Sequence, residues 1–133
     1  MAHSRLKYNV DLEKLTAESP GHFIVYCIKH VHNNKVYIGQ TKQALLTRIR
    51  AHKKRPVRKM RKDVQALQKT SETWTDVFKV YILDIVQSKR EANAVETKMI
   101  REFQSHTALG YNDPLMVGDP FCKGMYQQMY RRT

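Results

Sequence analysis

Two tyrosines, Tyr26 and Tyr37, lie in neighbouring apolar segments with ten residues between them. A phenol can orient a water molecule or, once deprotonated, take a proton from it. Further along the chain, Arg48 and His52 are four residues apart and therefore share one face of a helix. An arginine fork suits a phosphate, and a histidine titrates near neutral pH. The basic pair could therefore bind a phosphate, whereas the alternative is that the tyrosines only pack and the two basic residues only face solvent.

A carboxylate, Glu96, lies at the border of an apolar helical face, with Ala92 four residues before it and Ile100 four residues after it. Carboxylates are costly to desolvate against a core, so a cation is expected beside this one. A divalent metal with carboxylate and water ligands would serve phosphate chemistry. The alternative is a salt bridge to one of the many Lys or Arg residues.

A predicted hairpin would position the two tyrosines. Residues 22–30 and 35–41 are rich in β-branched and aromatic side chains, and Asn33 and Asn34 between them favour a turn. Side chains alternate along a strand, so both rings emerge on one face if the register allows it. Gly39 in the second strand indicates a kink or a close approach to the backbone.

Helices and one more strand are predicted after the hairpin. A helix from about residue 43 would carry Arg48 and His52, and a basic helix would start near Pro56. Ser88, with Glu91 three residues on, predicts a capped helix that runs to about residue 104. Residues 11–17 suggest a short helix, residues 71–75 a loop and residues 77–86 a third strand. The expected fold is α+β, a small three-stranded antiparallel sheet flanked by helices.

These pieces together resemble the GIY-YIG nuclease family. The sequence reads IVY at 24–26 and YIG at 37–39, followed by Arg48, His52, Glu96 within AxxxExxxI, and GYN at 110–112. Ile24 stands where the family name has its first glycine. The resemblance covers residues 22–112 and implies a metal-dependent DNA endonuclease.

The resemblance also implies a role for each matching residue. One Mg²⁺ or Mn²⁺ ion would be held chiefly by Glu96, and Arg48 would neutralise charge on the phosphorus oxygens. Tyr26 and Tyr37 would position or deprotonate the attacking water, with His52 as a competitor for the role of general base. Asn112 would brace the site. Because a phenol has a pKa of about 10, nearby Arg48, Lys42 and the metal are expected to lower it.

The charge of the chain points to a polyanion. Lys and Arg number 24 against 12 Asp and Glu, a net charge of +12, and DNA is the leading partner, ahead of an anionic membrane surface. Between residues 42 and 69 eleven basic residues accompany one acid, Asp63. The residues predicted to bind DNA are Lys42, Arg50, Lys53, Lys54, Arg55, Arg58, Lys59, Arg61 and Lys62. The alternative is a solvated helix face.

The predicted organisation is an N-terminal extension (1–21), a nuclease domain (22–112) with a basic helical insert at about 53–70, and a tail (113–133) with a helix near 122–131. So short a tail favours a free-standing, phage-type or restriction-like nuclease. Cleavage would be weakly specific, or a homodimer would read two half-sites. No apolar run reaches the ~20 residues of a membrane span. The two cysteines, Cys27 and Cys122, form no disulfide framework, so a cytoplasmic location is expected, in a bacterial or phage-infected cell by analogy with the family. Cys27 reads as a buried thiol. The rival hypothesis is a non-catalytic nucleic-acid-binding protein that retains the fold.

Overall fold

A three-stranded antiparallel sheet forms the centre of the protein. The computed structural model describes residue 6 and residues 9–16 and 21–114, so the helix predicted near residues 122–131 lies outside the described part. The strands are β1 (Phe23–His30), β2 (Val36–Thr41) and β3 (Phe78–Val86), in the order β2-β1-β3. With the helices on its two faces, this sheet gives the α+β fold that the sequence predicts.

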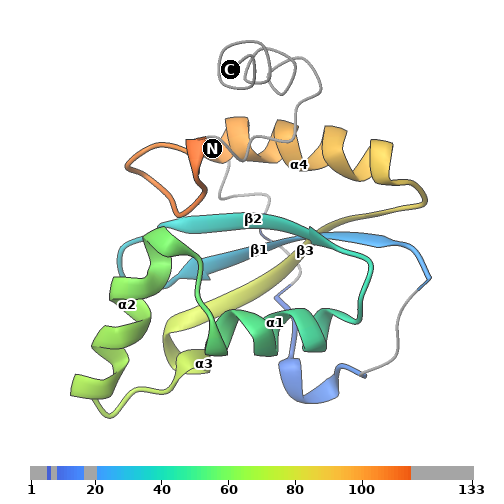
Figure 1. The fold of residues 1–133 in the computed structure, drawn as a ribbon. Helices are drawn as coiled ribbons and strands as arrows, with labels where there is room; N and C mark the ends of the chain where they lie inside the picture. Colours follow the sequence, from blue (N-terminus) through green and yellow to red (C-terminus); the bar gives the residue numbers. More distant parts are fainter. Residues whose placement is uncertain (1–5, 7–8, 17–20, 115–133) are drawn as a thin grey trace.

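The helices lie on opposite faces of the sheet. Helix α4 (Lys89–Phe103) covers one face by itself, and the other face carries the shorter helical elements (Figure 1). Those elements are α1 (Leu45–Lys54), η3 (Arg58–Met60), α2 (Arg61–Ala66), η4 (Leu67–Lys69) and α3 (Trp74–Val77). No helix among the described residues is long and apolar enough to cross a membrane.

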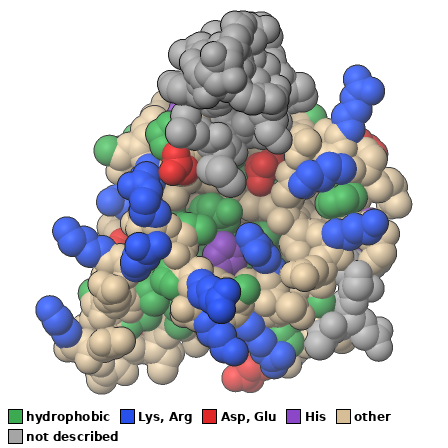
Figure 2. Space-filling model, in the orientation of Figure 1, with side chains coloured by type: hydrophobic (Ala, Val, Ile, Leu, Met, Phe, Trp, Pro, Cys, Tyr) green, Lys and Arg blue, Asp and Glu red, His purple; other side chains and the backbone are tan. Residues whose placement is uncertain are grey.

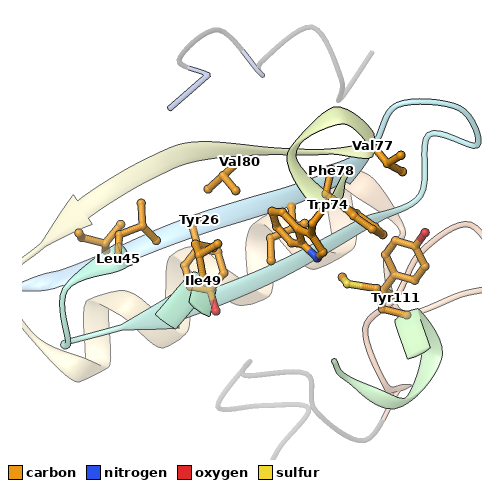
Figure 3. Packing of buried hydrophobic residues seen from close by; sticks show 11 residues of the cluster. Tyr26, Leu45, Ile49, Trp74, Val77, Phe78, Val80 and Tyr111 are labelled. Atoms are coloured by element: carbon orange, nitrogen blue, oxygen red, sulfur yellow. The ribbon is translucent and has the colours of Figure 1, made fainter. Parts of the chain in front are cut away.

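Strand alternation divides the apolar residues into two cores. Tyr26 and Ile28 of β1 pack in the core that faces α1, where Tyr26 lies close to Ile49 (Figure 3). Val25 and Cys27 of the same strand pack in the core beneath α4. The Cys27 thiol is completely buried, as predicted. Burial on both faces therefore fixes which side chains of β1 point toward each helical layer.

The hairpin has the register that the tyrosine pair requires. Tyr26 pairs with Gly39, and Ile28 pairs with Tyr37, so both phenols lie on the face that α1 covers. Asn34 adopts the left-handed conformation at the turn, with φ of 62°. On the other side of β1, the register with β3 shifts between Val25 and Tyr26, an irregularity of the kind that re-aims side chains next to functional sites.

Three local predictions differ from the structure. The loop predicted at residues 71–75 is wrong at its end, because Thr73 and Asp76 form a capping box that starts α3. The helix predicted at residues 11–17 is a single 3-10 turn, η2 (Leu12–Lys14). The basic helix predicted from near Pro56 is instead three short elements, η3, α2 and η4. Partly buried apolar side chains of this stretch pack against the core.

Helix α4 begins and ends close to its predicted positions. Ser88 accepts a hydrogen bond from the Glu91 backbone at 3.1 Å, and Gln104 ends the helix in the left-handed conformation. The chain then returns to the outer edge of β2, where the Tyr111 backbone N–H donates to the Val36 carbonyl at 2.9 Å. This return places Asn112 beside β2.

Candidate active site

The Tyr26 hydroxyl lies at the centre of a buried polar group. Its oxygen is 2.7 Å from Nε2 of His52 and accepts a hydrogen bond from Nε of Arg48 at 3.2 Å. The Tyr37 ring completes the group, with its centroid 6.3 Å from that of Tyr26 and 5.1 Å from that of His52. We call Tyr26, Tyr37, Arg48 and His52 the Tyr26 cluster. Four predicted site residues from β1, β2 and α1 are thus in contact.

The electrostatics of the cluster assign its protons. Burial, and then the charge of Arg48, lower the pKa of His52 to about 4, so the ring is neutral at pH 7 and one of its nitrogens accepts. The guanidinium of Arg48 can only donate. Its bond therefore uses one acceptor position of the Tyr26 oxygen, and the phenol donates to Nε2 of His52 when the neutral ring carries its proton on Nδ1.

In the protein without a bound metal, the phenol pKa values rise, and Arg48 alone does not produce the expected fall. Burial raises the pKa of Tyr26 above its ordinary value, and Tyr37 and Glu96 add to this, so that Arg48 does not compensate. Burial and Glu96 raise the pKa of Tyr37 in the same way. Desolvation disfavours the phenolate more strongly than one half-buried guanidinium favours it.

Gly39 leaves room for the Tyr26 phenol. A Cβ atom at position 39 would lie 2.6 Å from the Tyr26 hydroxyl oxygen and 2.8 Å from a ring carbon of Tyr37. The sequence predicts a kink or a close approach here, and the structure shows that a phenol approaches. The motif glycine is therefore required by the packing of the tyrosines.

Glu96 approaches the cluster from the other layer. It is half-buried on α4, and its charge acts on both phenols. Its Oε1 accepts a hydrogen bond from the side-chain amide of Gln40 at 3.2 Å, and the same amide nitrogen donates to Asn93 at 2.8 Å. The site is thus assembled around β2, with its phenols on one face and its carboxylate on the other.

The donor set at Glu96 is compatible with a lightly held divalent ion. Within the described residues no three His, Cys, Asp or Glu side chains are grouped closely enough to hold a metal. Mg²⁺ is commonly bound by one or two carboxylates, with waters and substrate phosphates as the other ligands. A single half-buried carboxylate at Glu96 fits that mode, and a closed protein cage does not.

Asn112 supports β2 from its outer edge. Its side-chain amide accepts from the Ile38 N–H at 2.8 Å and donates to the Ile38 carbonyl at 2.9 Å. The residue is 2% exposed. Since Ile38 lies between Tyr37 and Gly39, Asn112 braces the motif strand, as the resemblance implies, and is a positioning residue.

The predicted DNA-binding residues fall into two groups. All are exposed except Lys59, whose ammonium donates to the carbonyls of Thr107 and Asn112 at 2.8 and 2.9 Å. Lys59 is therefore committed to holding the loop after α4. A groove of about 530 Å³ lies between the end of α1 and α2. Four of the exposed residues line it, namely Lys53, Lys54, Arg55 and Arg61. Figure 2 shows this side of the molecule, where Lys and Arg side chains border a hollow that contains a histidine.

Three side-chain hydrogen bonds, two from Gln40 and one from Tyr111, are not predictable from the sequence. Gln40 is separated from Asn93 and Glu96 by more than fifty residues, and no periodicity links them. Tyr111 donates to Asp63 at 2.6 Å, which engages the one acid of the basic stretch. Only strand alternation at Gln40, which follows the motif glycine, could have placed its side chain on the α4 face.

Comparison with known proteins assigns most of the chain to one family. Residues 22–112 match the GIY-YIG catalytic domain, and the chain belongs to this family of nuclease domains. Among solved structures, it is similar to a mutant form of the catalytic domain of intron endonuclease I-TevI, with 28% identity and a TM-score of 0.49. That similarity covers 68% of this chain and 92% of the other. No curated protein matches the chain.

Proposed function

We propose that the protein is a metal-dependent DNA endonuclease that hydrolyses phosphodiester bonds. The observation that carries the proposal is the Tyr26 hydroxyl held between Nε of Arg48 and Nε2 of neutral His52. Arg48 is a donor that can bind a phosphate, and His52 is an acceptor that can take a proton. Both contact the same Tyr26 oxygen. Membership of a nuclease family supports the same reaction class.

In the proposed reaction, Arg48 binds the scissile phosphate, and its fixed charge stabilises the oxygens that become more negative in the transition state. Tyr26 orients the attacking water. As the water oxygen bonds to phosphorus, it gives its proton to the phenol oxygen, and the phenol passes its own proton to Nε2 of His52, so no free phenolate forms. The bond from phosphorus to the leaving sugar oxygen breaks, and that oxygen takes a proton from solvent. The raised pKa of Tyr26 favours this concerted transfer over a phenolate base.

Substrate binding would adjust the basicity of His52. Burial and Arg48 together hold the pKa of His52 at about 4, which makes the ring a weak base in the free protein. A phosphate bound at Arg48 offsets the guanidinium charge and raises that pKa toward the range of an efficient base. Because burial is the larger cause of the low pKa, the phosphate would restore only the part that is due to Arg48.

The divalent ion, Mg²⁺ or Mn²⁺, would be held at Glu96, one ion in each site, and would supply charge stabilisation when bound. Glu96 would then have two roles in the site. It provides the carboxylate oxygens for the cation, and without a cation its charge disfavours ionisation of Tyr26 and Tyr37.

The DNA backbone would follow the exposed basic residues. Helix α1 leads from Arg48 and His52 directly to Lys53 and Lys54, which line the groove beside α2. Lysine and arginine contacts of this kind neutralise phosphates and release counterions without reading bases. Weak sequence specificity follows from such contacts, unless a homodimer reads two half-sites.

Incubation of supercoiled plasmid and defined duplexes with the protein tests this function. We expect cleavage with Mg²⁺ or Mn²⁺ and none after chelation, and mapping of the ends gives the position of the cut. Sedimentation of the protein with DNA in parallel reports a homodimer. Binding without cleavage under all these conditions would favour a non-catalytic nucleic-acid-binding protein that retains the fold.

A further inference from the structure

The Gln40 side chain connects a surface lysine to the carboxylate of the site. Its Oε1 accepts from Nζ of Lys89 at 2.9 Å, while its Nε2 donates to Oε1 of Glu96 at 3.2 Å and to Asn93 at 2.8 Å. Both amide protons and the amide oxygen therefore have partners. The three contacts join the end of β2 to the first two turns of α4.

The chemistry of Lys89 and Glu96 fixes the orientation of the Gln40 side-chain amide between them. An ammonium can only donate, so the amide oxygen must point toward Lys89. An ionised carboxylate can only accept, so the amide NH₂ must point toward Glu96. The two requirements are independent and agree, which gives Gln40 one orientation.

The position of Gln40 on β2 relates it to the Tyr26 cluster. Side chains alternate along a strand, so Tyr37 and Gly39 belong to the α1 face, whereas Gln40, which pairs with Val25, belongs to the α4 face. One strand thus carries a phenol of the cluster on one side and the partner of the carboxylate on the other. Its backbone sets the distance between the two halves of the site.

We propose that Gln40 is a positioning residue that holds the Glu96 carboxylate at the end of β2, with Lys89 fixing the orientation of the Gln40 amide. The bond from Gln40 to Oε1 restricts rotation of the carboxylate that would hold the cation. This inference rests on the proposed nuclease function. Outer partners of metal-binding carboxylates commonly change activity by about 10–100-fold when they are removed.

Kinetics of Gln40→Met at saturating DNA and Mg²⁺ tests the proposal. We expect kcat to fall by about 10–100-fold, with KM for DNA and the melting temperature close to those of the wild type. Gln43→Met, which changes an exposed glutamine three residues further on, is the matched control and should keep full kcat. Lys89→Met should lower kcat less, and the Gln40→Met/Lys89→Met double variant should be no slower than Gln40→Met, because Lys89 acts through Gln40.

A spectroscopic readout tests the contact without any cleavage. The side-chain NH₂ resonances of Gln40, identified by their loss in Gln40→Met, should shift in Glu96→Ala and in Lys89→Met but not in Gln43→Met. Unshifted resonances, or a Gln40→Met variant with wild-type kcat beside an active wild type, would overturn the positioning role alone. A wild-type protein that binds DNA but never cleaves it would overturn the proposed function, and this inference with it.

Discussion

Replacement of Gly39 by alanine should disable the site by displacing a tyrosine. The new Cβ would lie 2.6 Å from the Tyr26 hydroxyl oxygen and 2.7 Å from the carbon that bears it. The first distance is 0.8 Å short of an ordinary 3.4 Å contact. The ring is fully buried beside Ile49, so the phenol must move by most of that difference and lose its alignment with His52 and Arg48.

The size of the effect follows from this displacement. A misplacement of about 1 Å at a reacting group costs on the order of 100-fold in rate, and overpacking costs about 1–3 kcal/mol of stability. Each kcal/mol lowers the Tm of a domain of this size by about 4–8 °C. Alanine is normally more favourable than glycine in a strand interior. A loss of stability in Gly39→Ala would therefore result from the contact between the new Cβ and Tyr26.

Plasmid cleavage well below the melting transition, together with thermal melting by circular dichroism, measures both effects. Gly39→Val should lose more activity than Gly39→Ala, because the larger side chain requires a larger movement of the phenol. A Gly39→Ala variant that melts at or above the wild-type temperature and cleaves DNA within about twofold of the wild-type rate would refute the reasoning.

Arg48→Ala should reduce kcat by about 10²–10³-fold, and Arg48→Lys should recover little of it, because a point charge does not replace the guanidinium fork; full rescue by lysine would show that only charge matters. The contribution of His52 to stability should grow by about 3 kcal/mol from pH 4 to pH 6.5, because the unfolded ring binds a proton in that range and the folded ring, with a pKa of about 4, does not. Urea unfolding of His52→Gln should show a flatter pH dependence than the wild type, and equal slopes would contradict the assigned protonation. Neutralising Lys53, Lys54 and Arg55 should weaken binding to all DNA sequences and reduce the salt slope by about 0.9 for each lost phosphate contact; an unchanged slope would place the DNA elsewhere.

The hairpin and its chemistry were predictable because they depend on local pattern. β-branched and aromatic runs flank the Asn33 turn, and strand alternation places Tyr26 and Tyr37 on one face. The i, i+4 spacing of Arg48 and His52 places both on one side of α1. Short-range periodicity was therefore sufficient to bring four site residues together.

The remaining features depend on burial and on contacts between distant segments. The pKa of Tyr26 rises because the ring is buried, whereas the cations expected near it, Arg48 and Lys42, had indicated the opposite direction. Lys59 looks like one more DNA-binding cation, yet the loop after α4 supplies two carbonyls for its ammonium. The partnership of Gln40 with Glu96 likewise exists only because α4 crosses the end of β2.

Cleavage and binding of one defined duplex by Glu96→Gln, beside the wild type, test the central claim most directly. The change keeps the size of the side chain and removes the charge that, in the proposed function, would hold the cation. We predict that cleavage is abolished while DNA binding stays equal or becomes tighter, because a negative charge near the phosphate is lost. A Glu96→Gln variant that cleaves at close to the wild-type rate would contradict the assignment of Glu96 and the metal-dependent reaction built on it.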